Sequence, residues 1–317
     1  MSATHADVVT PGPPVVTEVS DGVYAYIQPD GTWWINNTGF LVGRSRVAAI
    51  DACATETRTR ALLSAIGEVT TAPVQTLVNT HHHGDHTHGN SLFAEATIVA
   101  HELTREEILG EGKPGTSALI RSETWDPVDW GDLELAPPFL TYRTGIDLWV
   151  DDVRCEVRHV GIPAHSTNDS IVWIPDRRVL FAGDLLFNGG TPFLLAGSVA
   201  GASEAVRSLK DLGAETIVPG HGPVTGPSVI DHVLAYLEFV SNLATDAVES
   251  GATPLEAARS CDLGRFGELS DAERLVGNLH RAMAELRGTP AGGAIDFTAA
   301  LADMRTYNGG APLTCLA

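Results

Sequence analysis

Residues 80–90 read THHHGDHTHGN, and this stretch decides how the rest of the chain is interpreted. Five of the twelve histidines in the chain fall between His81 and His88. A purification tag would be terminal and uninterrupted, whereas this cluster is internal and follows residues 74–78, a β-branched run typical of a buried strand. We therefore expect an ordered functional site here rather than a solvated histidine-rich loop.

The spacing of the cluster indicates metal binding. His81, His83, Asp85 and His86 offer imidazole and carboxylate groups, which suit zinc and also iron or manganese. One loop cannot surround a metal, so further ligands are expected at the ends of other strands. The sequence offers three candidates that each follow an apolar run and stand beside glycine or proline: His165, Asp184 and His221.

In this order and spacing, the seven residues resemble the ligand set of metallo-β-lactamase-fold hydrolases. The run from Thr80 to His86, followed by Gly89-Asn90, is similar to that of the glyoxalase II-like branch. The resemblance covers about residues 19–225 and implies an α/β fold, a four-layer αββα sandwich. It also implies two zinc ions, with iron or manganese as alternatives. The implied ligands are His81, His83 and His165 for the first metal, Asp85, His86 and His221 for the second, and Asp184 as the bridge.

Neighbouring polar residues receive weaker interpretations. Asp51 matches an aspartate that orients a metal ligand in the family, although a solvated carboxylate at a strand end explains it nearly as well. His82 points away from its neighbours if the loop begins extended, so it is expected to pack rather than bind metal. For His88, the sequence leaves two roles open, a contact with the substrate and a structural role.

The chain is expected to divide into three parts. Residues 1–16 form a flexible lead-in, residues 17–228 the metallo-β-lactamase-fold domain, and residues 229–317 a helical extension. Two successive β-rich halves predict two sheets packed face to face and covered by helices. Residues 110–145, rich in Gly, Pro and Trp, are expected to form an irregular lid-like insertion.

Local signals also predict particular boundaries. Residues 43–46 form a hairpin turn, and Thr253-Pro254-Leu255-Glu256 forms a capping box. Helices are expected over 57–66, over 202–212 and from Ser270, and Gly67 and Gly213 end the first two.

Composition limits the partners. The 317-residue chain carries a formal charge of −20 and has two lysines, which argues against nucleic acid and anionic membrane surfaces. The four cysteines show no C-x-x-C spacing, no apolar run reaches about 18 residues, and the N-terminus resembles no signal peptide. The sequence therefore predicts a cytoplasmic protein; a homodimer stays open.

Two dications would lower the pKa of a shared water from about 15.7 towards 7 and would polarise a substrate carbonyl. Asp85 and Asp184 would hold the resulting nucleophile in line with that carbonyl, giving hydrolysis of an ester, thioester or lactone. No G-x-S-x-G element offers a covalent route. We expect a hydrophobic acyl substrate, because aromatic residues crowd the predicted rim. The expected pocket residues are Trp33, Trp34, His88, Phe187 and Phe193, with Trp125, Trp130, Phe139 and residues 192–195 on the same rim.

Residues 159–170 and 187–192 also look like those of metallo-β-lactamase-fold cyclase/thioesterases of aromatic polyketide pathways. That resemblance implies an acyl group carried on an acyl carrier protein. A lactonase or general esterase and a non-hydrolytic metal-binding or regulatory module are the alternatives. A mononuclear iron enzyme of the persulfide dioxygenase type is disfavoured, because Asp85, His86 and His221 would complete a second metal site that such relatives do not use. A glutathione thioester is doubtful, because no lysine follows residue 226.

Overall fold

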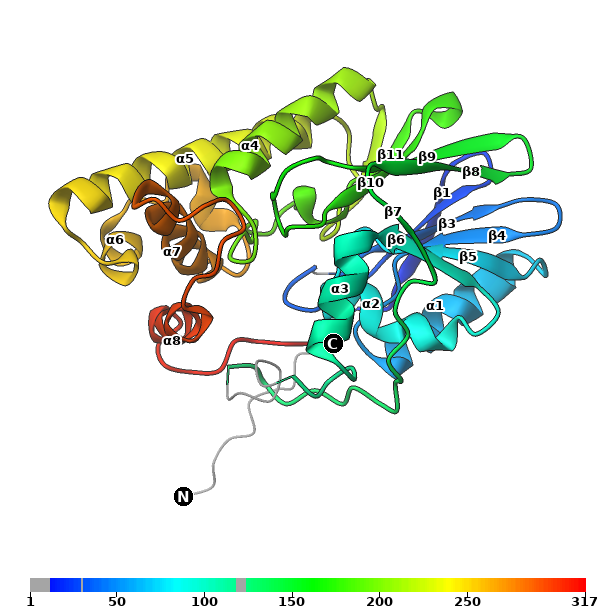
Figure 1. The fold of residues 1–317 in the computed structure, drawn as a ribbon, viewed down its shortest axis with the longest axis horizontal. Helices are drawn as coiled ribbons and strands as arrows, with labels where there is room; N and C mark the ends of the chain where they lie inside the picture. The colour runs from blue at the N-terminus through cyan, green and yellow to red at the C-terminus, as the bar shows by residue number, and fades with distance from the viewer. Residues whose placement is uncertain (1–11, 30, 118–123) are drawn as a thin grey trace.

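A computed structural model describes residues 12–29, 31–117 and 124–317 of the chain (Figure 1). Residues 1–11 of the expected lead-in and residues 118–123 of the expected lid lie outside the described residues. The first strand begins at Val15, two residues before the predicted start, so the end of the expected lead-in already belongs to a sheet.

The first sheet contains seven strands in sequential order. β1 to β4 pair antiparallel, and β4 to β7 pair parallel. The hairpin turn predicted at 43–46 is confirmed, because Gly43 N donates to Arg46 O at 2.9 Å. The strands are β1 Val15–Ser20, β2 Val23–Ile27, β3 Thr38–Val42, β4 Val47–Ile50, β5 Val74–Val78, β6 Thr97–His101 and β7 Leu140–Tyr142.

The second sheet contains five strands in the order β12-β11-β10-β9-β8. β11 and β12 are parallel and are joined through helix α4, Val199–Ser208, whereas the other neighbours are antiparallel. The strands are β8 Gly145–Val150, β9 Val153–His159, β10 Ser170–Ile174, β11 Val179–Phe181 and β12 Thr216–Val218.

The alternation of side chains along β4 shows how the layers form. Ala48 and Ile50 point between the sheets, into the core that also holds Val172 of β10. Val47 and Ala49 point the other way, into a core that also holds Leu62 of helix α1. The prediction of an α/β four-layer αββα sandwich with C-terminal helices is confirmed.

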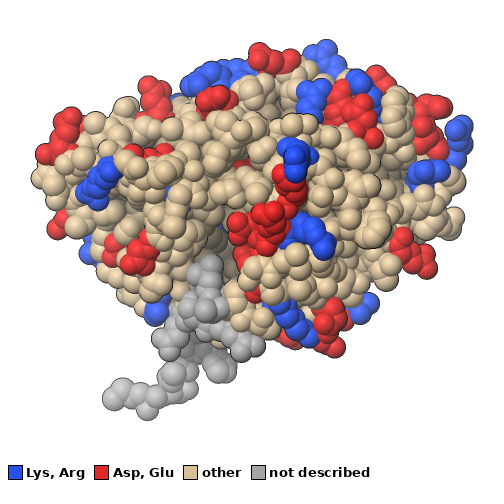
Figure 2. Space-filling model, viewed as in Figure 1, with Lys and Arg blue, Asp and Glu red and all other residues tan. Residues whose placement is uncertain are grey.

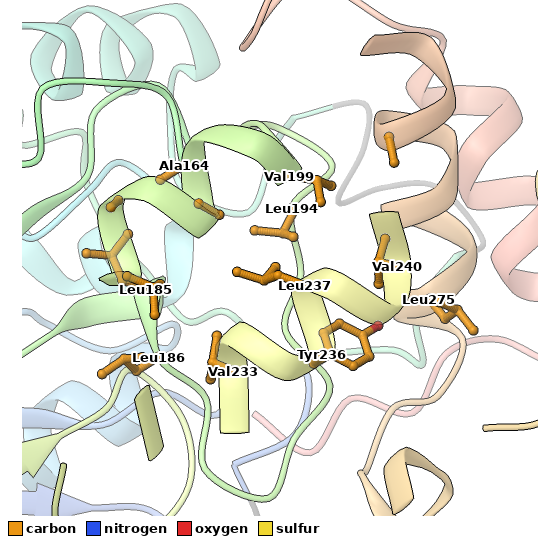
Figure 3. Close-up of a cluster of buried hydrophobic side chains, with 14 of the residues drawn as sticks. Ala164, Leu185, Leu186, Leu194, Val199, Val233, Tyr236, Leu237, Val240 and Leu275 are labelled. Carbon is orange, nitrogen blue, oxygen red and sulfur yellow. The ribbon is translucent and has the colours of Figure 1, made fainter. Parts of the chain in front are cut away.

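Helices cover both outer faces of the paired sheets (Figure 1). The first sheet carries α1 Glu56–Val69, α2 Gly84–Thr87 and α3 Glu102–Glu111. The second carries α4 and α5 Ser228–Ser250, followed by α6 Pro254–Ser260, α7 Arg274–Leu286 and α8 Phe297–Tyr307. Tyr236 and Leu237 of α5 pack with Leu194, Val199 and Leu275 in one buried cluster, so the C-terminal helices continue the core of the second sheet (Figure 3).

Several predicted helix ends are wrong. α1 continues through Gly67 to Val69, because a glycine on this open face weakens the helix by only about 1 kcal/mol. α4 begins earlier than residue 202, because the Ser198 side chain accepts the Gly201 N–H and caps the helix. α7 begins later than Ser270, because Asp271 takes a left-handed φ of 53°.

The structure confirms or corrects the other local predictions. The capping box at Thr253 is present with both of its hydrogen bonds. Gly213 ends the short 3₁₀ turn that follows α4, in the left-handed conformation. The expected insertion at 110–145 is not wholly irregular, because Leu140–Tyr142 joins the first sheet as β7. No helix in the described part of the chain is both long and apolar enough to cross a membrane.

Candidate metal centre

The candidate site lies where strands of the two sheets end. His81 and His83 follow β5, and Asp85 and His86 lie in the short helix α2 behind them. Asp184 follows β11. His221 follows β12, which pairs in parallel with β11. His165 lies in the loop between β9 and β10. The chain turns sharply at each strand end, which directs polar side chains into one space.

The structure brings together all seven residues that the sequence singled out. The first group consists of His81, His83 and His165, and the second of Asp85, His86, Asp184 and His221; potential ligand atoms within each group lie within 4.8 Å of one another. Asp184 also reaches the first group, because its Oδ2 lies 3.4 Å from His165 Nε2. This contact fits the bridging position that the resemblance implied for Asp184.

Hydrogen bonds to Nδ1 orient four of the imidazoles. A partner at Nδ1 leaves the Nε2 lone pair free for a metal. The contacts are His86 with Asp51 Oδ2 at 2.9 Å, His221 with Gly31 O at 3.0 Å, His165 with Phe193 O at 2.5 Å, and His81 with Thr80 Oγ1 at 3.1 Å. Asp51 therefore makes the orienting contact that the family resemblance implied, and it is buried rather than a solvated carboxylate at a strand end.

The hydrogen-bond partners of the buried nitrogen and oxygen atoms indicate that the seven residues fit metal ions. Within the described structure, the buried Nε2 atom of His81 makes no hydrogen bond, and the buried His86 Nε2 and Asp184 Oδ1 atoms lie 3.0 Å apart without hydrogen-bond geometry. His165 Nε2 and His83 Nδ1 face each other at 2.7 Å. Buried polar atoms without partners are costly, and metal ions would satisfy this set of nitrogen and oxygen donors.

Electrostatics divide the two groups. Burial lowers the pKa of His81 and His83 well below the usual range, and their histidine neighbours add to this shift, so both stay neutral. In the second group, burial opposes ionisation of Asp184, but His221 and His86 outweigh it and hold its pKa well below the usual range. Against burial, Asp184 and Asp85 in turn raise the pKa of His221 to about 9 and that of His86 well above its usual range. The second group therefore pairs carboxylates with protonated imidazoles, whose Nε2 protons a metal ion would displace.

A pocket opens onto the two groups. Its wall includes His83, Asp85, His165, Asp184 and His221. All five expected pocket residues, Trp33, Trp34, His88, Phe187 and Phe193, line it, and so does Trp125. The predicted position of Phe139 is wrong: this side chain is 87% exposed and does not line the pocket. Trp130 contacts the rings of Trp34 and His88 from outside.

Sequence reasoning missed part of the wall. Glu111 at the end of α3, Arg274 of α7, and Phe297 and Leu301 of α8 also line the pocket. The helical extension therefore helps to shape the candidate site. No motif marks these positions, because they reach the pocket through packing of distant helices.

His82 behaves as predicted for a packed residue. It is not in either metal group, its ring contacts Asn168, and burial lowers its pKa to about 4. His88 is buried, stacks on Trp34 with ring centroids 5.8 Å apart, and also has a pKa lowered to about 4, mainly by burial. Both rings are therefore neutral at pH 7.

Comparisons with known proteins agree with this geometry. The model of the metallo-beta-lactamase superfamily matches residues 31–221, so the chain belongs to that superfamily. In the solved metallo-beta-lactamase from Pontibacter korlensis, the same fold recurs with a TM-score of 0.59 and 22% identity, over 71% of this chain and 99% of that one.

Curated relatives differ in their described activities. The metallo-beta-lactamase type 2 of Bacteroides fragilis is 22% identical, over 71% of this chain and 88% of its own length. The hydroxyacylglutathione hydrolase of Rhodospirillum rubrum is 30% identical, over 48% of this chain and 50% of its own length. The beta-lactamase-like protein 2 homolog of Caenorhabditis elegans is 26% identical, and the match covers 53% of this chain and 49% of that protein. The chain thus spans about half the length of two of these three relatives.

Proposed function

We propose that this protein is a dinuclear zinc hydrolase that cleaves an acyl ester or thioester, with iron or manganese as alternative metals. The observation that carries the proposal is that two ligand groups, with four of their five imidazoles oriented from behind, open into one pocket that several Trp and Phe side chains line. Relatives described as hydroxyacylglutathione hydrolase and metallo-beta-lactamase support a hydrolase.

The residues of the two groups have different roles in the proposed reaction. The two groups would each hold a metal ion, and when bound these ions would supply Lewis-acid activation of water and of a carbonyl group. The residues are His81, His83 and His165 in the first group and Asp85, His86, Asp184 and His221 in the second. Asp85 lines the pocket, which supports a role for its carboxylate in orienting the attacking water. Asp184 lies 3.2 Å from His221 Nε2 and 3.4 Å from His165 Nε2, which places its carboxylate between the two groups. The carbonyl of Phe193 holds His165 and thereby links the pocket wall to the ligands.

The favoured specific form is an aromatic polyketide cyclase/thioesterase. Trp33, Trp34 and Phe193 provide flat apolar walls, which suit an extended or aromatic acyl group. The substrate would be free or carried on an acyl carrier protein in the cytoplasm. On the face shown in Figure 2, Lys and Arg side chains lie in small groups interspersed with Asp and Glu, in keeping with a partner other than nucleic acid.

The test is thioester hydrolysis by the zinc-loaded protein. Short, long and aromatic β-ketoacyl thioesters are compared with simple esters and lactones, and bound zinc is measured in parallel. Asp184→Ala should abolish turnover, whereas Asp152→Ala, in an exposed turn between β8 and β9, should leave it unchanged.

The substrate profile separates the specific forms. Highest turnover on the aromatic β-ketoacyl thioesters supports the cyclase/thioesterase. Turnover restricted to esters or lactones would replace it with the esterase or lactonase. If the protein binds two metal ions per chain and turns over none of these compounds, the hydrolase proposal is wrong.

A further inference from the structure

Arg274 is a buried cation in the pocket wall. It is the first residue of α7 and is 1% exposed, although arginine is among the residues least often buried. Its guanidinium carbon lies 4.2 Å from the ring centroid of Trp33 and 5.3 Å from that of Phe187. Residue 274 lies beyond the matched family region, 31–221, so this charge comes from the helical extension.

The hydrogen bonds of Arg274 are incomplete. Nη1 donates to the carbonyl of Thr191 at 3.0 Å, and Nη2 pairs with Asp271 Oδ2 at 2.8 Å. Nε is buried and makes no hydrogen bond to any described residue. Leaving a buried donor unpaired costs about 1–3 kcal/mol, so an acceptor on a bound ligand would be strongly favoured there.

The surroundings indicate which acceptor fits. Asp271 already balances the positive charge of Arg274, and the neighbouring carboxylate of Glu273 accepts the Trp33 Nε1–H at 2.6 Å. A ligand carboxylate would add a second acidic group beside a guanidinium whose charge Asp271 already balances. A neutral carbonyl oxygen would satisfy the donor without that repulsion, while the aromatic walls bury the body of the ligand.

We propose that Arg274 binds a neutral ketone oxygen on the acyl part of the substrate, away from the bond that is cleaved. Oxo-substituted aromatic acyl groups are then the preferred substrate class. The cleavage step rests on the function proposed above, whereas the ketone contact does not, because it needs only the pocket wall.

The first experiment uses the wild-type zinc-loaded protein and measures calorimetric binding of acids that are not cleaved. 4-Oxo-4-phenylbutanoate is compared with 4-phenylbutanoate, which lacks the ketone, and with 2-phenylglutarate, which carries a carboxylate at that carbon. The pair is repeated with the ketone one carbon nearer and one carbon farther. At least one ketone should bind about tenfold more tightly than its methylene partner. Equal binding of every pair, or tighter binding of the diacid, would overturn the proposal.

The second experiment uses Arg274→Lys, which keeps the charge and removes the Nε–H. The ketone preference should fall to about one, with unchanged affinity for 4-phenylbutanoate. Arg287→Lys, an exposed site after the same helix, should keep the preference. If Arg274→Lys does not fold, equal binding of every pair by the wild-type protein would still overturn the proposal.

Zinc content separates ligand binding from a positioning role. Phe187 stacks on His221 with ring centroids 4.9 Å apart, so Arg274 could instead support a metal ligand through Phe187. Zinc loss in Arg274→Lys with an unchanged ketone preference would establish that role and overturn the proposal. A ketone preference that depends on Arg274, in a protein that hydrolyses no thioester, would leave this site standing while the proposed hydrolysis fails.

Discussion

Asp51 Oδ2 accepts a hydrogen bond from His86 Nδ1 at 2.9 Å, and the same carboxylate accepts the backbone and hydroxyl hydrogens of Thr80 at 2.7 and 2.8 Å. Asp51 has a φ of 62°, which is rare for a residue other than glycine. Three hydrogen bonds hold this strained backbone in place. The result is that His86 Nε2 turns toward the second ligand group.

Asp51→Asn should weaken zinc binding by about 10- to 100-fold, the usual cost of losing the group that orients a metal-bound imidazole. The loss should appear in the second group, to which His86 belongs. Competition with a chromophoric chelator measures the two zinc affinities. Asp152→Asn, at an exposed position, is the matched control; equal affinities in both variants would show that Asp51 does not orient His86.

Gly220 sets how closely the backbone approaches Asp184. A Cβ at this position would lie 1.9 Å from Asp184 Oδ1 and 2.8 Å from the backbone carbon of Gly183. Gly220→Ala should therefore push the Asp184 carboxylate out of place and lower the free energy of unfolding by about 1–3 kcal/mol. We expect less than the wild-type amount of bound zinc, measured by elemental analysis.

Gly67→Ala is the control for the alanine itself. A Cβ at Gly67 would meet nothing within 4 Å, and the residue lies inside α1. Helix propensity predicts that this variant is stabilised by up to about 1 kcal/mol, with normal zinc content. Wild-type zinc binding in Gly220→Ala would contradict the close approach.

The metal residues were predictable from the sequence because the signal is local. Four of them stand within six positions, 81–86, and Asp184 and His221 each stand beside a glycine at the end of an apolar strand. The order of predicted strands and helices likewise indicated the two packed sheets and their covering helices. Arg274 and Phe297 carried no such signal, since their place in the pocket depends on how α7 and α8 pack against distant segments.

Trp33 ties the pocket wall to the helical extension. Its indole Nε1–H donates to the Glu273 carboxylate at 2.6 Å, across 240 positions of sequence. Trp33→Phe keeps the aromatic ring but leaves this buried carboxylate without its donor, which should cost about 1–3 kcal/mol of stability. Urea unfolding measures the change. Trp149→Phe, at a side chain that is 56% exposed, should change stability far less; similar losses in the two variants would mean that the hydrogen bond contributes little.

Glu111 at the end of α3 should make stability depend on pH. Burial, with smaller contributions from Glu107 and Asp85, raises the pKa of Glu111 from 4.5 to about 7. The folded state therefore favours the protonated form, and stability falls as pH rises from 4.5 to about 7, because the unfolded chain ionises first. The side chain is 41% exposed, so solvent screens part of this effect.

Glu111→Gln removes the ionisation and should raise the Tm of the metal-free protein at pH 8 while leaving it nearly unchanged at pH 4. Glu106→Gln, at an exposed position on the same helix, controls for the change in net charge. Thermal unfolding of all three proteins at both pH values makes the comparison. A gain that is equal at pH 4 and pH 8, or equal in the two variants, would show that Glu111 does not titrate in this window.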